Sequence, residues 1–266
     1  MTHEKAKVVT TGNTTLLESR ALTPSTAPGS MDSFSLPLAA WEAWPPGPRT
    51  QPERAAQSGS PTDAADIAFV DPMLRRRLGP VARMALNVAH RCLGGRAGVP
   101  MIFASRHGEL ARTLTMLNAL ATGEDVSPAA FSLSVHNAAA GVFSIARQDT
   151  APATAIAAGD ETLGMALVEA RARLSAATPS ILLVYADAPA PELYQADIAA
   201  AESPHALALL LDLNHPPCLQ VSARPATGEP SGDTMSQRLL ELLSRQAPHA
   251  QWTGQRTHWE WTRKDA

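Results

Sequence analysis

Residues 131–171 read FSLSVHNAAAGVFSIARQDTAPATAIAAGDETLGMALVEAR, and this stretch decides the fold. Its apolar pattern predicts a helix over 137–147, a short buried strand over 153–158 and a second helix over 161–176. A tight elbow, Ala158-Gly159-Asp160-Glu161, joins that strand to the second helix. The start of a helix stabilises an anion through its dipole and free backbone N–H groups, so enzymes of this layout place a nucleophile there. Neither Cys nor Ser stands at this elbow, which predicts a scaffold for catalysis without its reactive atom.

The composition is that of an ordinary globular protein, with 45% hydrophobic and 18% charged residues. A net charge of −3 gives no broad electropositive surface, so we expect no nucleic-acid partner. Arg75, Arg76 and Arg77 form a local basic run, which is either a solvated helix face or a contact for a partner carboxylate or phosphate.

Cysteine is scarce, with only Cys92 and Cys218, which fits a protein of the reducing cytoplasm. Cys92 falls at an apolar-periodic position and is expected to be buried. The spacing of His and Cys matches no metal site, and we predict neither a metal nor a cofactor. No apolar run reaches the length of a membrane-spanning helix.

Strands and helices are predicted to alternate on both sides of the opening stretch. Further strands are expected at 34–41, 99–104, 181–185 and 206–213. Further helices are expected at 72–93 and 109–121; the first of these has Asp71 as its N-cap and Pro72 in its first turn. This alternation predicts an α/β layered domain in which helices cover a mixed sheet.

The chain is expected to have three parts. Residues 1–30, rich in Thr, Ser, Pro and Gly, predict a disordered extension, or an upstream start codon with Met31 as the true beginning. Residues 31–214 are expected to form the domain. Residues 215–266 are interpreted as a Pro-rich linker with one short helix at 234–245 and a Trp-rich tail, whose three Trp residues either form a partner-docking patch or fold back onto the domain.

Two Ser/His pairs offer an alternative chemistry. Ser105 and His107 follow the strand at 99–104, and Ser134 and His136 precede the helix at 137–147, so a serine hydrolase or acyltransferase is an alternative hypothesis. Neighbours two positions apart on a turn rarely face each other, and no G-x-S-x-G motif occurs. His136 is therefore expected to satisfy a buried carbonyl, and the acidic residues of the elbow to cap the helix that follows.

The ordered stretch SVHNAAAGVFSIARQDTAPATAIAAGDETLGMALVEAR resembles the active-site elbow region in the N-terminal half of β-ketoacyl synthases. The upstream segments RRRLGPVARMAL and FASRHGEL match the same half, so the resemblance covers residues 31–213. It is closest to short ketosynthase-like chain length factors of aryl-polyene and other type II fatty-acid-like pathways. The fold implied is a layered thiolase-like half-fold that lacks the second, C-terminal half.

The departures from this family imply a loss of catalysis. A condensing ketosynthase carries Cys at the elbow, and that place falls at or next to Asp160, within the degenerate elbow Gly159, Asp160 and Glu161. The two His residues of the family belong to its second half, which we expect to be absent here. Thioester exchange and condensation need a thiolate and an oxyanion-stabilising pair. No catalytic residue is therefore assigned.

The resemblance also implies a partner. In the family, the strand before the elbow and its flanking helices form a twofold interface, so this chain is expected to bind an active ketosynthase as a heterodimer, with an acyl carrier protein as a possible further partner. A homodimeric scaffold for acyl chains is a third hypothesis. The residues expected at the interface are small: Asn137, Ala140, Gly141, Ala153, Ala155 and Ala157.

Overall fold

Two sheets organise the part of the chain that the computed structural model describes, which comprises residues 32–45, 66–194, 203–216 and 218–264. All of these residues belong to one compact unit that spans 31–266. The extension predicted over 1–30 lies outside the described residues.

The first sheet has five strands in the order β2-β6-β5-β3-β4. Its parallel part consists of β3 (Met101–Ala104), β4 (Ala153–Ile156) and β5 (Ser180–Asp187), while β6 (His205–Asp212) and β2 (Leu38–Trp44) run antiparallel. β5 and β6 are apolar almost throughout because helices cover both faces of the sheet. The predicted mixed sheet is confirmed.

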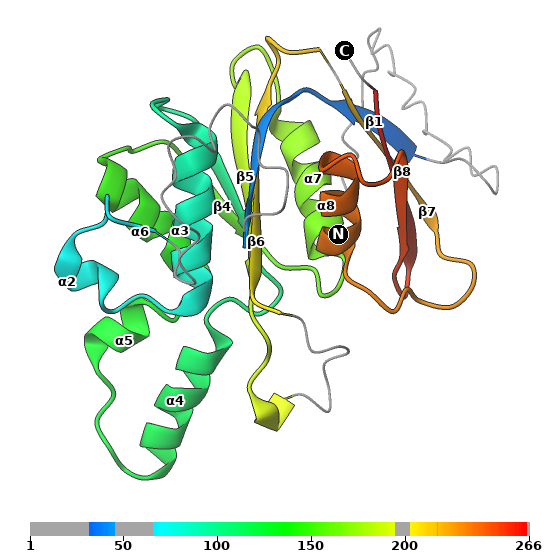
Figure 1. The fold of residues 1–266 in the computed structure, drawn as a ribbon. Helices are drawn as coiled ribbons and strands as arrows, with labels where there is room; N and C mark the ends of the chain where they lie inside the picture. Colours follow the sequence, from blue (N-terminus) through cyan, green and yellow to red (C-terminus); the bar gives the residue numbers. More distant parts are fainter. Residues whose placement is uncertain (1–31, 46–65, 195–202, 217, 265–266) are drawn as a thin grey trace, which may run out of the picture. The chain divides into compact units, whose positions relative to one another are not determined.

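Helices pack on both faces of this sheet (Figure 1). On one face, α3 (Pro80–Leu93) and α6 (Ala138–Arg147) share a core with the sheet, and Cys92 is buried in it as predicted. On the other face lie α7 (Thr162–Arg173) and α8 (Met235–Leu243), between the first sheet and the second. The helices predicted at 137–147 and 161–176 are thus confirmed.

The single helix predicted over 72–93 is wrong, because the structure holds two. Asp71 caps the short α2 (Pro72–Arg75), accepting hydrogen bonds from Met73 N–H and Leu74 N–H. α2 ends at Arg75, the backbone is extended at Gly79, and the next helix begins at Pro80. Proline disfavours a helical conformation in the preceding residue, and its own missing N–H is tolerated in a first turn.

A second, antiparallel sheet corrects the interpretation of residues 215–266 as a linker and tail. Its order is β1-β7-β9-β8, formed by β1 (Asp32–Leu36), β7 (Leu219–Pro225), β9 (Thr257–Arg263) and β8 (His249–Thr253). Three of these four strands come from the segment that the sequence analysis left without strands. Only its helix, now α8, was predicted.

The tryptophans of this segment fold back onto the domain and form no surface patch. Trp252, Trp259 and Trp261 are 5%, 2% and 0% exposed, and they share one core with α7 and α8. They alternate with polar residues along β8 and β9, so one face of the second sheet is apolar and the other polar.

The strand predicted at 34–41 is also two strands, one in each sheet. β1 ends at Leu36 and β2 begins at Leu38, with Pro37 between them. The Leu36 carbonyl accepts from Cys218 N–H at 3.2 Å, and the Pro37 carbonyl accepts from Asp212 N–H at 2.9 Å. One nearly continuous extended segment therefore belongs to both sheets.

The remaining helices are short. The helix predicted at 109–121 is α4 (Leu110–Ala121), which is followed by α5 (Pro128–Ser132), and a 3-10 helix spans Glu192–Tyr194. Across the described ranges, no helix combines the length and apolar character that a membrane span requires.

Candidate functional site

The carboxyl ends of the three parallel strands bring the predicted polar residues together. Ser105, Arg106 and His107 follow β3, the elbow follows β4, and Asp187 ends β5. In layered α/β proteins, sites form at this edge of the sheet because the loops that leave neighbouring strands converge there.

The elbow has the predicted geometry. Gly159 takes a positive φ of 58°, which a residue with a side chain rarely adopts. The buried Thr162 hydroxyl donates to the Gly159 carbonyl at 2.6 Å and accepts from Ala158 N–H at 2.9 Å. This one hydroxyl closes the turn at the start of α7 and fixes the elbow's shape.

The two acidic residues of the elbow do not cap α7, contrary to expectation. The N-cap residue Glu161 makes no side-chain capping hydrogen bond, and its Oε1 accepts from Thr257 N–H at 3.1 Å. Asp160 forms an ion pair with Arg106, with 2.8 Å between Oδ1 and Nη2. Both carboxylates therefore make long-range contacts, one to β9 and one to the loop after β3.

A network of hydrogen bonds holds the loop after β3. The Ser105 hydroxyl donates to Asp187 Oδ1 at 2.7 Å and accepts from Gly108 N–H at 2.8 Å. Arg106 N–H donates to both Asp187 oxygens, at 3.0 and 3.1 Å. Sequence reasoning missed Asp187, although a carboxylate that directly ends an apolar strand was a usable signal.

The histidines complete this cluster. His136 Nε2 lies 2.9 Å from the Ser105 carbonyl oxygen and carries the proton of that hydrogen bond, because a carbonyl only accepts. His136 therefore satisfies a buried carbonyl, as expected. The pKa of His107 is lowered from 6.5, first by burial and then by the positive charge of Arg106, so His107 favours its neutral form.

This geometry does not support the hydrolase alternative. Ser105 is fully buried, and its hydroxyl hydrogen is directed at Asp187 and not at an imidazole. The Ser134 hydroxyl donates to the Phe131 carbonyl at 2.8 Å. A serine nucleophile needs an exposed hydroxyl that is hydrogen-bonded to a base, and neither Ser/His pair provides one.

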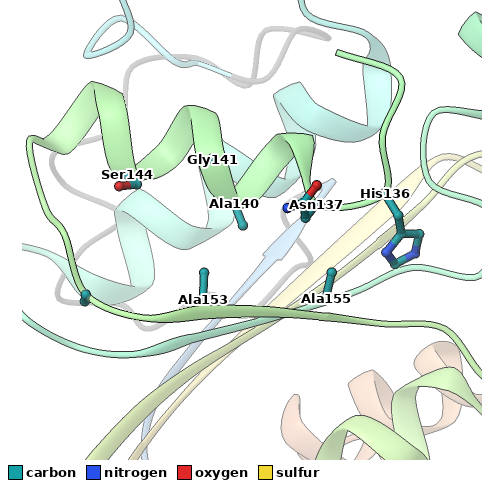
Figure 2. A pocket seen from close by; sticks show the side chains of 8 residues that line it. His136, Asn137, Ala140, Gly141, Ser144, Ala153 and Ala155 are labelled. Carbon is teal, nitrogen blue, oxygen red and sulfur yellow. The ribbon is translucent and has the colours of Figure 1, made fainter. Parts of the chain in front are cut away.

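A second feature lies between α6 and β4. A pocket of about 470 Å³ is lined by His136, Asn137, Ala140, Gly141, Ser144, Ala151, Ala153 and Ala155. Figure 2 shows the side chains of Ala153 and Ala155 pointing from β4 towards α6, and that of Ala140 pointing back from α6 towards β4. Five of the six residues predicted for partner binding line this pocket, and the sixth, Ala157, is exposed between β4 and the elbow.

β4 is the outermost strand of its sheet. Within the described ranges it pairs only with β3, so its other side offers unpaired backbone groups. Ala153 is exposed, and the rest of β4 is half-buried. The strand predicted over 153–158 therefore exists, but the prediction that it is buried is wrong, since an edge strand keeps one side open.

The described residues contain no group of three or more His, Cys, Asp or Glu side chains that is arranged to hold a metal ion. At the elbow itself, the structure presents the carboxylate of Asp160 paired with the guanidinium group of Arg106. A carboxylate paired with a guanidinium group is a weaker nucleophile than a thiolate.

Comparisons with known proteins agree with this architecture. A solved structure from Xenorhabdus doucetiae, a ketosynthase (ApeO) in complex with its chain length factor (ApeC), contains a chain that matches with a TM-score of 0.72 and 26% identity, over 86% of this chain and 100% of that chain. The ishigamide ketosynthase/chain length factor matches with a TM-score of 0.53 and 16% identity, over 80% of this chain and 73% of that one.

A β-ketoacyl synthase from Burkholderia phymatum STM815 has the same fold, with a TM-score of 0.50 and 11% identity over 80% of this chain and 64% of that one. No curated protein sequence matches. The family model described as "Beta-ketoacyl synthase, N-terminal domain" matches residues 41–262, a range that includes most of the second sheet. The chain therefore belongs to the β-ketoacyl synthase N-terminal domain family.

Proposed function

We propose that this chain is a chain length factor: a catalytically silent ketosynthase homologue that forms a heterodimer with an active β-ketoacyl-ACP synthase in polyene or fatty-acid-like biosynthesis. The observation that carries the proposal is the elbow. It makes a tight turn from β4 into α7, with a positive φ at Gly159, and it presents Asp160 paired with Arg106. By the resemblance to condensing ketosynthases, this is the place where such an enzyme carries its thiolate.

The Xenorhabdus doucetiae match supports this reading. All of the matched chain aligns to 86% of the present one, so the matched chain is no longer than this one. A catalytic ketosynthase with two thiolase-like halves would extend well beyond the range of this chain. The match is therefore the one expected for the shorter member of a ketosynthase/chain length factor pair.

The pocket between α6 and β4 is the proposed contact for the ketosynthase. The open edge of β4 can pair with a strand of another subunit, because its outer backbone groups have no partner in the described part of the chain. The alanines and Gly141 that line the pocket leave room for side chains of that subunit. Both features occur at the same edge of the sheet.

Co-expression with the complete ketosynthase of the same gene neighbourhood tests the proposal. We expect a stable 1:1 complex, and we expect no acyl group on Cys92 or Cys218 by intact mass after incubation with an acyl-carrier thioester. Ala155→Arg should weaken the complex at least tenfold by filling the pocket. Ala172→Arg, at an exposed position of α7, is the matched control. Separate elution at micromolar concentration, or stoichiometric acylation, contradicts the proposal.

An acyl carrier protein is the second partner that we propose. The guanidinium groups of Arg83 and Arg112 donate to the carbonyls of Arg75 and Arg77, both at 2.6 Å. Together with the exposed Arg76, they gather positive charge around the turn between α2 and α3. In a chain of net charge −3, such a local surface favours an acidic protein.

A further inference from the structure

The polar face of the second sheet joins a hydroxyl, an imidazole and a carboxylate through two hydrogen bonds. His258 Nδ1 lies 2.7 Å from Thr253 Oγ1, and His258 Nε2 lies 3.0 Å from Glu260 Oε1. Both separations are ordinary hydrogen-bond distances. All three residues belong to β8 and β9, so this cluster shares no residue with the elbow or with the loop after β3.

Strand geometry brings the three side chains together. His258 and Glu260 are two positions apart on β9, so they share one face of the strand, and the buried Trp259 and Trp261 occupy the other. Thr253 pairs directly with His258 between β8 and β9. Residues directly opposite each other in an antiparallel pair have neighbouring side chains, so the hairpin register alone builds the cluster.

The two hydrogen bonds run in one direction. A carboxylate only accepts, so His258 Nε2 carries the proton that is donated to Glu260. In the neutral imidazole, Nδ1 then has no proton and accepts from the Thr253 hydroxyl. Thr253 is therefore hydrogen-bonded to a base whose tautomer is fixed by a carboxylate, which is the arrangement that activates a hydroxyl nucleophile.

Thr253 also differs from Ser105 in its accessibility. Ser105 is fully buried and its hydroxyl donates to Asp187, whereas Thr253 is half-buried and bonds to an imidazole. The Glu260 side chain is 38% exposed and that of His258 is 10% exposed. The base is thus shielded from water while the groups on either side of it are partly open.

Neighbouring groups hold Thr253 in place and add hydrogen-bond donors. Ser231 N–H donates to the Thr253 carbonyl at 2.8 Å, and Thr253 N–H donates to Ser231 Oγ at 2.9 Å. The Ser231 hydroxyl can donate its own hydrogen while it accepts. Arg224 pairs with His258 between β7 and β9 and lies 3.7 Å from Glu260, so it adds positive charge to this face. Such donors suit the negative oxygen of an acyl-transfer intermediate.

We infer that Thr253, His258 and Glu260 form a site that hydrolyses esters of short acyl groups. In the first step, Thr253 Oγ1 bonds to the ester carbonyl carbon while His258 Nδ1 takes the hydroxyl proton. The ester C–O bond then breaks, and the departing alcohol takes that proton, which leaves Thr253 acylated. In the second step, water attacks the acyl carbon and gives a proton to His258. The acid is released, and Thr253 recovers its proton.

The surroundings of the site favour a short acyl group. Gln251 and Arg224 lie on the same face as the cluster, and both are polar. A long apolar chain would gain little from such neighbours, since its stabilisation comes from apolar contact. This activity is separate from condensation at the elbow, so the inference goes beyond the proposed function and does not depend on it.

The full chain and its variants are tested with p-nitrophenyl acetate, and absorbance follows the release of p-nitrophenolate. Thr253→Val keeps the shape of the side chain without its hydroxyl, and His258→Gln removes the base. Each should lower the protein-dependent rate by about tenfold. Thr253→Ser restores a hydroxyl and should retain the activity. Thr262→Val removes an exposed hydroxyl farther along β9 and is the matched control, with an unchanged rate.

Peptide mapping after an acid quench locates the acetyl group. We expect it at position 253 in the unmodified chain and in Thr253→Ser. Acetylation of amines is easily recognised, because the chain has only three lysines, Lys5, Lys7 and Lys264. If Thr253→Val hydrolyses the ester as fast as the unmodified chain, the inference is overturned. Should the Val and Gln variants fail to fold, position 253 decides: an acetyl group there supports the site, and its absence from both the unmodified chain and Thr253→Ser overturns it.

Discussion

Asp160 lies 2.8 Å from Arg106, across the gap between the loops that follow β4 and β3. The Arg106 side chain is 9% exposed, whereas that of Asp160 is 40% exposed. The more buried member of the pair is thus the cation. It lies in the loop after β3, at the carboxyl ends of the parallel strands.

The asymmetry of this pair gives the first prediction. Asp160→Asn should lower the free energy of unfolding by about 1 kcal/mol, because a largely buried guanidinium group loses its counter-charge. In an Arg106→Met background the same substitution should cost almost nothing, since Asp160 is then a hydrated carboxylate. Urea unfolding of the four proteins of this double-mutant cycle measures the coupling, and strictly additive effects would show that the ion pair contributes nothing.

The second prediction concerns Glu109, which substitutes for a missing N-cap. Gly79 has no side chain to cap α3, and Glu109 Oε1 accepts from Ala82 N–H at 3.0 Å instead. Glu109→Ala should lower the free energy of unfolding by about 1–2 kcal/mol, because it leaves that N–H unsatisfied. Glu109→Gln keeps an acceptor and should cost less. Equal losses in the two variants would contradict this role.

Glu109 also predicts a pH dependence. Burial raises its pKa above the ordinary 4.5, although Ala82 N–H and Arg112 oppose the shift. The folded protein therefore binds a proton more readily than the unfolded chain, and this group's contribution to stability falls as the pH rises from 4.5 through the raised pKa. Glu109→Gln should remove this component from a pH series of melting temperatures.

The third prediction concerns His90, whose pKa is lowered from 6.5 by burial and by the charge of Arg147. His90 Nδ1 accepts from Arg147 Nη1 at 3.1 Å, and the ring stacks on Phe69 at 4.0 Å. The unfolded chain binds this proton more readily, so stability should be lost as the pH falls below 6.5 towards the lowered pKa. His90→Gln should weaken the dependence of the melting temperature on pH in that range. If the melting temperature of the variant falls as steeply with pH as that of the unmodified protein, His90 is not the group responsible.

The fourth prediction compares two helical glycines. A Cβ on Gly164 of α7 would lie 2.6 Å from Cζ2 of the buried Trp259, so Gly164→Ala should destabilise the protein by about 1–3 kcal/mol. A Cβ on Gly141 of α6 meets no atom within 4 Å, so Gly141→Ala should stabilise it by about 0.5–1 kcal/mol. Thermal unfolding of both variants is the measurement, and a tolerant Gly164→Ala would mean that the tryptophan can move aside.

The fifth prediction concerns the positively charged turn between α2 and α3. Arg76→Glu/Arg77→Glu should weaken binding of the acyl carrier protein to the heterodimer at least tenfold, and the affinity of the unmodified complex should fall with added salt. Arg171→Glu at an exposed position of α7 controls for net charge. Fluorescence anisotropy of a labelled carrier protein measures the affinity of the unmodified complex, the double variant and the control. If neither the charge reversal nor added salt changes the affinity, the carrier protein does not dock at this surface.

Most strands and helices of the first sheet were predicted correctly, because the apolar period within each segment is enough to identify it. The small residues before Gly159 and the apolar period after it predict strand, elbow and helix without any long-range information. The interruption between α2 and α3 could also have been predicted, since Pro80 disfavours a helical conformation at Gly79. It was missed because the apolar period continues through residues 72–93.

The second sheet was missed although its signal was present. Trp259 and Trp261 alternate with polar residues, which is the period of a strand, but the short segment at the end of the chain was interpreted as a tail. The pair Arg106–Asp160 was beyond local reasoning. Its partners lie far apart in the sequence, and only the parallel register of β3 and β4 brings their loops together.

Because β1 and β2 are joined at Pro37 and belong to different sheets, the two sheets depend on each other when the protein is shortened. In a fragment that stops before β7, β1 would lose the only strand with which it pairs in the described chain. The side of α7 that contacts Trp259 would also become exposed to solvent. Trimmed expression boundaries should therefore retain both ends of the 32–264 range, because the amino-terminal strand and the carboxyl-terminal hairpin close the same core.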